Sequence, residues 1–475
     1  MDNQRSFPLP VGPSRRLRPG EPHALPHREV HVTNTPLFVL FSLLGCGPGD
    51  DKDSVDTSET ATHDSADTAT ASQDSADTAD TLTEAPSIWP EAPYVDSLFS
   101  VWLDGSAVSK DCVWWVNDIE TDSVCSPLGE DLGLSLGDRV AVSLNGSERS
   151  AEVEVIERPD LLVTETMASP GRLSLLDGVT GVVLHQVQVG GAMPYTMPIA
   201  PVVVNDVAYF TAHLGYINGE GIHKVGGEPL DEQTTANASG TVYWADADPD
   251  TDSLWVADMA RTALTPYGLD DLEMGVPLSL PMPPVTIRIQ DGIGWVASNN
   301  GGSPTGGSIG PKGETPAGYL SRVELASGTI DSVEIGEAPY WAEPSPSGDL
   351  IAVADTDADT LVLVSSDLEV VATYPVGEAP TGVAWSPQGT EIYVALYSGG
   401  AVVSLDPTTG ETLQQWDLKS GKATAGVVGV YPRADGRYLY VPVLHENRLV
   451  VIDTATEAEP ESWEGVTGPR GVAFW

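Results

Sequence analysis

The residues of this chain that are best suited to bind a ligand or take part in a reaction follow short apolar segments. These segments recur along the last two thirds of the chain. Three of them are carboxylates, Glu165, Asp258 and Asp355, and two are histidines, His213 and His445. Carboxylate oxygens are the ligands that Ca²⁺ prefers, and a histidine held near a carboxylate can act as a general acid or base. These residues are far apart in the sequence, so any shared chemistry depends on the fold that positions them.

Sequence motifs for catalysis are weak. Gly306–Gly310 has the spelling of a nucleophile elbow, but it lies in the Gly- and Pro-rich stretch 299–316 and not at a turn from a strand into a helix. The segments Asp246–Asp252 and Asp355–Asp359 resemble calcium loops, yet both lack the glycine and the distant glutamate of an EF-hand. The favoured interpretation of both is a polar turn, and we predict no catalytic residues.

A repeated phrase indicates the fold that positions the candidate residues. The segment from Glu378 to Ala395 repeats the segment from Glu337 to Ala354, 41 residues earlier. A period of about 40 to 45 residues with several short strands per unit is typical of a β-propeller blade, which contains four strands. Seven second strands are predicted, at Leu162–Thr164, Tyr209–Thr211, Trp255–Ala257, Trp295–Ala297, Ala352–Ala354, Tyr393–Ala395 and Tyr440–Pro442.

The end of the sequence supplies the one strand that the first repeat lacks. Pro469–Phe474 copies Pro380–Trp385, whereas no such strand precedes Leu161. We therefore expect the C-terminal strand to complete blade one, because joining the termini in one blade leaves no unpaired inner edge. The sequence predicts an all-β protein in which residues 160–475 form a seven-bladed β-propeller closed by its C-terminal strand.

The second-strand segments resemble the YVTN-repeat β-propeller family, named for a Tyr-Val-Thr-Asn signature in that strand. The resemblance covers about two thirds of the chain, from Leu161 to Trp475, and the Asn position is here taken by other residues, among them Glu165, Asp258 and Asp355. It implies a seven-bladed propeller. It does not imply one activity, because such propellers serve as binding, surface and enzyme-associated modules.

A propeller fold places the loops after the second strands on one face, around the mouth of the central channel, where ligands are usually bound. This fold predicts a ligand site formed by Glu165, His213, Asp258, Asp355 and His445. Two interpretations of the carboxylates are open. They cap turns through hydrogen bonds to the backbone, or Glu165, Asp258 and Asp355 converge on Ca²⁺. No other cofactor is predicted.

An apolar run from Leu37 to Leu44 ends at Gly45-Cys46. The run is too short to span a bilayer and has the pattern of a signal peptide. Leu43–Cys46 resembles the lipobox of bacterial lipoproteins, which implies that residues 1–45 are removed and that Cys46 carries lipid. The alternative is an ordinary signal peptide with a cysteine there by chance. The residue after Cys46 is Gly47 and not aspartate, which by this resemblance favours the outer membrane. The protein would face the periplasm or the cell surface.

Residues 46–84 are mainly Asp, Thr, Ser and Ala, with Asp-Ser-Ala-Asp-Thr-Ala written twice. Low hydrophobicity with one sign of charge predicts a disordered acidic tether. Residues 85–159 follow, with short apolar or alternating runs that indicate a small, sandwich-like β-domain. If Cys46 is lipidated, Cys112 and Cys125 are the only remaining thiols, so we expect a disulfide between them in an exported protein. Two reduced, buried thiols are the alternative.

The formal net charge is -47. Phosphate contacts need a basic patch, so nucleic acid is excluded as a partner. The leading interpretation is a monomeric cell-envelope lipoprotein that touches the membrane through its lipid only and whose propeller binds an envelope protein or a small ligand. The alternative is a propeller enzyme, either a lactonase-like hydrolase or a metal-assisted lyase, which requires the channel-mouth carboxylates and His213 or His445 to lie within hydrogen-bond reach.

Overall fold

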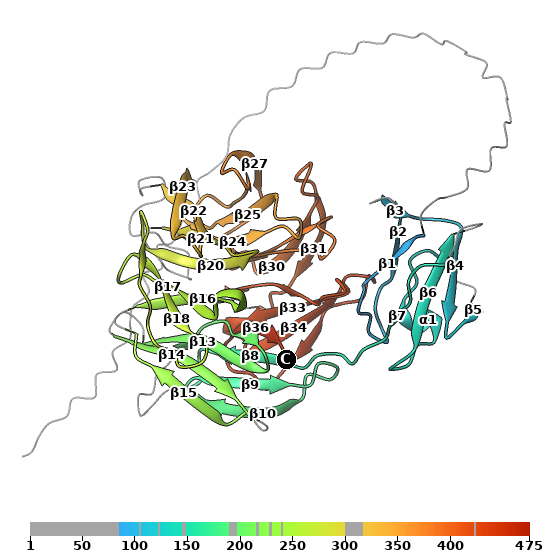
Figure 1. Cartoon of the computed structure of the whole chain (residues 1–475), viewed down its shortest axis with the longest axis horizontal. Coiled ribbons are helices and arrows are strands. Elements are labelled where there is room, and N and C mark those ends of the chain that lie inside the picture. The colour runs from blue at the N-terminus through green and yellow to red at the C-terminus, as the bar shows by residue number, and fades with distance from the viewer. Residues whose placement is uncertain are drawn as a thin grey trace, which may run out of the picture. The chain divides into compact units, whose positions relative to one another are not determined.

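A computed structural model describes residues 85–103, 106–121, 124–144, 149–189, 197–214, 218–227, 230–238, 241–299, 317–421 and 424–475. The predicted signal peptide, Cys46 and the predicted tether lie outside the described residues, and so does the glycine-rich stretch 300–316 with its elbow-like motif. The described chain is almost entirely β-structure (Figure 1). None of its helices is long and apolar enough to cross a membrane.

Residues 85–159 form two small antiparallel sheets, one with strand order β1-β2-β3 and one with order β5-β4-β6-β7. Phe99 and Trp114 are fully buried between them, with ring centroids 5.3 Å apart. Cys112 and Cys125 are joined by a disulfide, as predicted. The elements are β1 (Ser87–Trp89), β2 (Ser100–Leu103), β3 (Ser106–Val108), β4 (Cys112–Val116), β5 (Ile119–Thr121), α1 (Gly129–Leu132), β6 (Arg139–Leu144) and β7 (Val153–Glu154).

Seven antiparallel sheets follow along the described chain. The first sheet has the order β10-β9-β8-β36, and in the second both β11 and β12 pair with β13. The strands of the first three sheets are β8 (Leu161–Glu165), β9 (Arg172–Leu176), β10 (Val183–Gln188), β11 (Met197–Pro198), β12 (Val202–Val204), β13 (Val207–Leu214), β14 (Asn218–Gly226), β15 (Glu232–Ala236), β16 (Val242–Asp248), β17 (Ser253–Asp258), β18 (Ala263–Gly268) and β19 (Leu278–Ser279).

The remaining four sheets each have four strands in sequence order. Two short 3₁₀ turns, Pro249–Thr251 and Leu444–Glu446, interrupt the described β-structure. The strands are β20 (Pro284–Gln290), β21 (Ile293–Ser298), β22 (Gly318–Glu324), β23 (Thr329–Ile335), β24 (Pro339–Pro344), β25 (Leu350–Asp355), β26 (Thr360–Ser365), β27 (Val370–Pro375), β28 (Pro380–Trp385), β29 (Ile392–Leu396), β30 (Ala401–Leu405), β31 (Thr412–Asp417), β32 (Tyr431–Pro432), β33 (Tyr438–Val443), β34 (Arg448–Asp453), β35 (Glu461–Trp463) and β36 (Pro469–Phe474).

Every predicted second strand lies inside a strand that is second in its sheet, namely β8, β13, β17, β21, β25, β29 and β33. The C-terminal strand β36 pairs with β8, with Val472 opposite Val163. The first strands also contact one another in turn. β12 contacts β16, the contacts continue through β20, β24, β28 and β32, and β36 contacts both β33 and β12.

The first strands approach one another most closely where a glycine removes the side chain. A Cβ built on Gly471 would lie 2.2 Å from Cα of Ala200, and one built on Gly382 would lie 2.6 Å from Cα of Gly429. Distances this short cannot be accommodated without moving the backbone, so only glycine fits. These positions let neighbouring first strands pack closely against one another.

Asp96 and Ser97, between β1 and β2 of the first small sheet, contact residues of the seventh large sheet through a buried ionic cluster. Arg433 is 1% exposed, and its Nη2 lies 2.6 Å from Oδ2 of Asp435 and 3.1 Å from Oδ1 of Asp96. The Ser97 hydroxyl donates a hydrogen bond to Asp435 at 2.8 Å. The positive charge of Arg433 is thus paired with the negative charges of Asp435 and Asp96, and such pairing is the condition under which buried ions are tolerated.

Candidate functional site: a cavity in the channel

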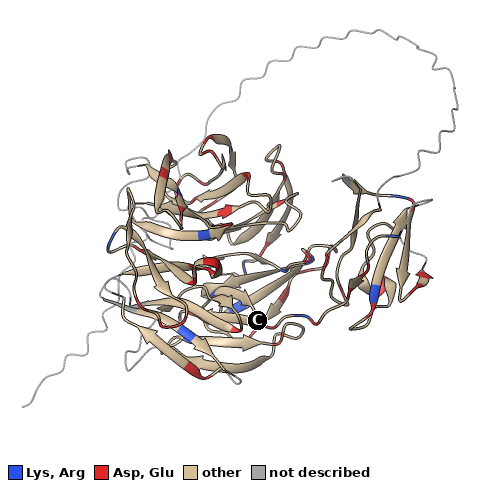
Figure 2. Ribbon diagram, viewed as in Figure 1, with Lys and Arg blue, Asp and Glu red and all other residues tan. Residues whose placement is uncertain are grey.

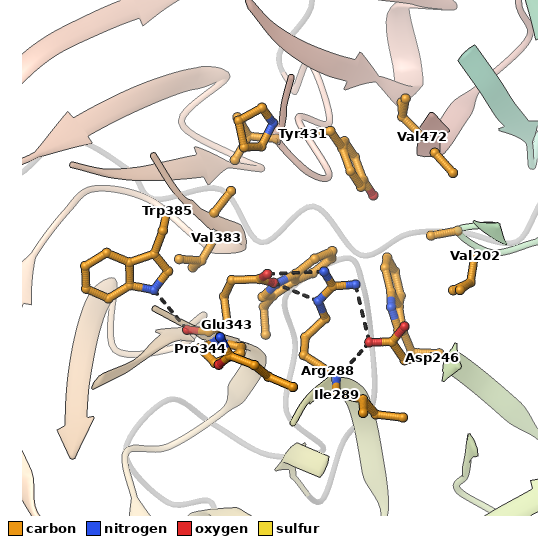
Figure 3. Close-up of a pocket in the computed structure, with 18 of the residues that line it drawn as sticks. Val202, Asp246, Arg288, Ile289, Glu343, Pro344, Val383, Trp385, Tyr431 and Val472 are labelled. Carbon is orange, nitrogen blue, oxygen red and sulfur yellow. Dashed lines mark hydrogen bonds and ion pairs between the residues drawn. The ribbon is translucent and has the colours of Figure 1, made fainter. Parts of the chain in front are cut away.

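A cavity of about 530 Å³ lies among the first strands of the seven sheets (Figure 3). In each sheet the repeat phrase begins with a proline or a valine, and the fifth residue counted from it lies in the cavity wall. Each sheet thus contributes one wall residue at an equivalent position. These residues are Val202, Asp246, Arg288, Glu343, Ala384, Tyr431 and Ala473.

Arg288 is the charged centre of the cavity, and the carboxylates of the two neighbouring first strands hold it in place. Its Nε lies 3.0 Å from Oε2 of Glu343, and its Nη1 lies 3.6 Å from Oδ2 of Asp246 (Figure 3). Asp246 also accepts the backbone N–H of Ile289 at 2.8 Å. The three groups carry one net negative charge, and Arg288 keeps about a third of its side chain exposed to the cavity.

Burial dominates the electrostatics of this trio. It raises the pKa of both Asp246 and Glu343 above the ordinary carboxyl value, and the nearby Arg288 only partly offsets this. For Arg288 burial alone would lower the pKa, but Glu343 and Asp246 raise it above its ordinary value. The ionised trio is therefore held together by mutual attraction in a place that solvates single charges poorly.

Aromatic side chains form much of the remaining wall. The rings of Trp244 and Trp341 meet edge to face with centroids 4.5 Å apart, and Trp341 meets Tyr431 in the same way at 6.4 Å. The Trp341 indole donates to Glu343 at 2.9 Å, and the Trp385 indole donates to the backbone carbonyl of Glu343 at 3.0 Å. These contacts fix the cavity wall before any ligand arrives.

A second set of channel residues lies three positions earlier on the same strands. Tyr243, Tyr340 and Arg470 each follow the first residue of the repeat phrase, where the strand pairing changes register. Such bulges turn a side chain away from the regular alternation of the strand. The Tyr243 and Tyr340 hydroxyls lie 2.8 Å apart, and Nη2 of Arg470 donates to both, at 3.2 Å to Tyr340.

The predicted channel-mouth site is only partly assembled among the described residues. His445 lies in the turn Leu444–Glu446, and its Nε2 is 2.7 Å from the hydroxyl of Tyr397, the residue that follows β29. His213 ends the described part of β13, opposite Met197, and its side chain is outside the described residues. Of the five predicted ligand residues, His445 is the one with a described contact to a residue after another second strand.

The three predicted calcium ligands are buried, and each has its own partners. Glu165 pairs with Arg172 and accepts hydrogen bonds from Ser174 and from the backbone of Thr467. Asp258 pairs with Arg261 at 2.5 Å. Asp355 accepts the backbone N–H groups of Glu337 and Ala338, both at 2.8 Å.

Backbone N–H groups donate to all three carboxylates, and Glu165 and Asp258 also pair with an arginine. Burial raises the pKa of Asp355, while its backbone hydrogen bonds lower it in part. In the described ranges, no three His, Cys, Asp or Glu side chains converge where they could hold a metal ion. The structure therefore does not bring Glu165, Asp258 and Asp355 together.

Comparisons with known proteins concern the fold. No protein-family model matches the chain, and no curated protein matches it. A protein of unknown function from Desulfotomaculum acetoxidans superposes with a TM-score of 0.51 and 13% identity, covering 66% of this chain and 98% of its own. Hydrazine synthase from Kuenenia stuttgartiensis superposes with a TM-score of 0.49 and 14% identity, covering 67% of this chain and 93% of its own. Virginiamycin B lyase from Staphylococcus aureus superposes with a TM-score of 0.39 and 16% identity, covering 48% of this chain and 73% of its own.

The likeness to the Desulfotomaculum acetoxidans protein, together with the successive antiparallel sheets, defines the class of the protein as an all-β chain with a propeller-like fold. At an identity this low it carries the fold alone.

Proposed function

We propose that the protein is a cell-envelope lipoprotein whose β-propeller binds a small ligand in its central channel. The observation that carries this proposal is the cavity of about 530 Å³, to which all seven large sheets contribute a wall residue. Binding pockets of soluble proteins commonly have volumes of roughly 300 to 1,000 Å³ and combine apolar walls with a few fixed polar groups. The cavity meets both criteria through its tryptophans and the Arg288 trio.

The fold behind this proposal is a closed ring of seven blades. Its support is the pairing of β36 with β8 and the order of first-strand contacts, which runs from β12 to β36 and back to β12. The resemblance of the second strands to YVTN repeats points the same way. A closed ring leaves no unpaired inner edge, and it would make the channel a fixed compartment.

The cellular location is proposed from the sequence. The lipobox-like Leu43–Cys46 and the long acidic segment after it suit a lipid-anchored chain displayed away from a membrane surface. Fatty-acid labelling tests this proposal directly. Wild-type protein should incorporate label and the Cys46→Ala variant should not, whereas equal labelling of the two would remove the lipoprotein proposal.

Binding is favoured over catalysis because the charged groups of the cavity are already matched to one another. Arg288 engages both Asp246 and Glu343, and Glu343 also accepts the Trp341 indole. Such a trio can orient a ligand. Neither carboxylate is left unengaged beside a nucleophile or an attacking water, as general base catalysis requires.

An enzyme remains the second candidate, because the Tyr397–His445 contact joins a potential acid to a potential base across two blades. A lactonase-like hydrolase built on it would lose at least about a hundredfold of its rate in His445→Gln, the order of magnitude that one positioned acid or base contributes. Lactone hydrolysis at equal rates by wild type and variant would exclude His445 from that role.

A thermal-shift screen of the purified chain tests the binding proposal. Sugars, organic acids, neutral aromatics, lactones and metal salts form the panel, and at least one organic class should raise the melting temperature. The Val202→Trp variant, which fills the cavity from β12, should lose the response. A panel without any stabilising organic compound would contradict the proposal.

A further inference from the structure

Arg470 is a buried cation without a carboxylate partner among the described residues. It is 6% exposed, and its hydrogen bonds go to two tyrosine hydroxyls. Its guanidinium also lies 5.4 Å from the ring centre of Tyr243. Nε is buried and makes no hydrogen bond. An isolated charge in such a place is strongly disfavoured unless a counter-charge accompanies it.

The other two buried arginines of the described chain show what Arg470 lacks. Arg433 pairs with Asp96 and Asp435, and Arg437 pairs with Glu130 and Asp453. Tyrosine hydroxyls can accept hydrogen bonds from a guanidinium, but they supply no negative charge at neutral pH. Among the described residues, Arg470 therefore has acceptors for only some of its N–H donors, and no carboxylate balances its positive charge.

The surroundings of Arg470 connect it to the cavity. Val472, two residues further along β36, lines the cavity, as does Tyr431. Both Arg470 and Arg288 act on the hydroxyl of Tyr431 electrostatically. That hydroxyl is buried without a hydrogen bond of good geometry, although the Val472 N–H lies near it. Arg470 does not itself line the cavity, but its unused donors and the Tyr431 hydroxyl lie next to the part of the wall that Tyr431 and Val472 form.

We propose that the channel binds an oxyanion group of its ligand, a carboxylate or a phosphate, against the Arg470 guanidinium. This inference rests on the proposed function, because it names the chemical class of the ligand in the same channel. A guanidinium presents five N–H donors and matches a carboxylate or phosphate in a two-pronged contact. Among the described residues the hydrogen bonds of Arg470 use Nη2 alone, so Nη1 and Nε keep donors for an anion. An anion would bind at the end of the guanidinium through Nη1 and Nη2, or at its edge through Nε and Nη2.

The rest of the ligand follows from the cavity wall. Apart from the Arg288 trio, much of the cavity wall is aromatic and aliphatic, with Trp385, Val383 and Val202 among its members. The Arg288 trio carries its own counter-charges and offers hydrogen bonds without calling for a second anion. The expected ligand is a small organic acid with one anionic group and an apolar or aromatic body.

The test compares anions with neutral compounds of the same shape. Benzoate and phenyl phosphate are titrated against the purified chain by calorimetry at constant ionic strength, with benzamide and benzyl alcohol as the neutral pair. Wild type should bind at least one anion at least about tenfold more tightly than either neutral compound, since about 1.4 kcal/mol corresponds to tenfold. Arg470→Gln should lose this preference, and Arg470→Lys should retain part of it.

The control variant is Arg322→Gln, which removes an arginine that pairs with Glu324 on β22, outside the cavity lining. It should bind as wild type does. If Arg470→Gln does not fold, Tyr340→Phe takes its place and should weaken anion binding while leaving the neutral compounds unaffected. The selectivity of the wild type is an independent readout in either case.

The outcomes separate the two proposals. Neutral aromatics that bind wild type and Arg470→Gln equally, but not Val202→Trp, would leave channel binding standing and overturn the anion site. Anions that bind no better than their neutral counterparts would overturn it as well. If no compound binds any form of the protein, both proposals fall.

Discussion

The hydroxyl groups of Tyr243 and Tyr340 lie 2.8 Å apart, although the residues are 97 positions apart in the sequence. They come from β16 and β24, and the first strand between them, β20, carries Val285 at the equivalent position. The small side chain of Val285 allows the two longer ones to meet across it. Their contact, with Arg470 donating to both, ties three of the seven sheets together at the channel.

Removing one hydroxyl of this pair should destabilise the protein measurably. Tyr340→Phe leaves Tyr243 and the buried Arg470 with fewer partners, and losing a buried hydrogen-bond partner costs about 1 to 3 kcal/mol. Urea unfolding of both forms measures the difference. Tyr319→Phe is the matched control, because its hydroxyl makes only an exposed 3.5 Å contact with Glu334. A Tyr340→Phe protein as stable as wild type would mean that Arg470 does not depend on this pair.

The proposed closure of the ring should depend on Gly471. A methyl group there would meet the backbone of Ala200 at 2.2 Å, so Gly471→Ala should force β36 and the second sheet apart, at roughly 1 to 3 kcal/mol, the usual range for overpacking. Gly226→Ala is the control, since its Cβ would make only an ordinary 3.5 Å contact with Val207. Melting temperatures decide the matter, and equal values for the two variants would argue against close packing of β36 on that sheet.

The disulfide should stabilise the small N-terminal sheets. Cys112 and Cys125 are 13 residues apart, and closing a loop of about 15 residues is worth about 3 kcal/mol in the chain-entropy model. Cys125→Ala should lower the melting temperature of this region in calorimetry, and a reductant should affect wild type alone. Cys46→Ala, which leaves the disulfide intact, should melt as wild type does. An unaltered melting profile for Cys125→Ala would show that the bond contributes nothing.

His223 should make stability depend on pH. Burial lowers its pKa from 6.5 to about 4; the ring stacks on Phe210 and its Nε2 has no hydrogen-bond partner. Between these values the unfolded chain binds a proton that the folded chain does not. The contribution of His223 to the free energy of unfolding is therefore fully present above pH 6.5. It is lost as the pH falls toward 4, and the loss is about 3 kcal/mol at most.

The His223→Phe variant isolates that contribution. The difference in unfolding free energy between wild type and variant should change in favour of the variant across this interval, as measured by urea unfolding at several pH values. A difference that stays constant with pH would show that the imidazole accepts its proton in the folded state as readily as in the unfolded one.

The fold was accessible to sequence analysis because each large sheet repeats one phrase. The second strands, three of them marked by Tyr-Val-Ala or Trp-Val-Ala, all lie where the repeat predicts, and the match of Pro469–Phe474 to Pro380–Trp385 identified the strand that pairs with β8. A central strand must be apolar on both faces, so its pattern is strong. The loops after those strands carry no comparable constraint.

The cavity was missed because its residues lie within the first strands and not in loops. Asp246, Arg288, Glu343 and Tyr431 occupy the position that is alanine in the clearest repeats, at Ala384 and Ala473. Aligning the repeats and asking where polar residues replace alanine would have found them. The same alignment singles out Arg470, which stands where Thr381 does. Glu165, Asp258 and Asp355 are near-equivalent too, but each is engaged by partners of its own, such as Arg172, Arg261 and the backbone of Ala338.

Acidic residues are spread over the described chain and outnumber Lys and Arg on its strands and loops (Figure 2). The whole sequence has 69 Asp and Glu against 22 Lys and Arg. Against that background, one arginine in the cavity wall, Arg288, and one buried arginine near it, Arg470, are a specific arrangement. Salt should therefore weaken any attraction of the outer surface for cations more than it weakens binding inside the channel, because buried pairs are screened less.

The central claim is that the channel cavity is the binding site, and one titration tests it most directly. A compound that stabilises wild type is titrated by calorimetry into wild type, Val202→Trp and Val370→Trp. Val202 lines the cavity, whereas Val370 lies half-exposed on β27, an outermost strand. The account predicts that Val202→Trp abolishes binding and that Val370→Trp binds as wild type does. Equal binding by all three proteins would place the site elsewhere and contradict the account.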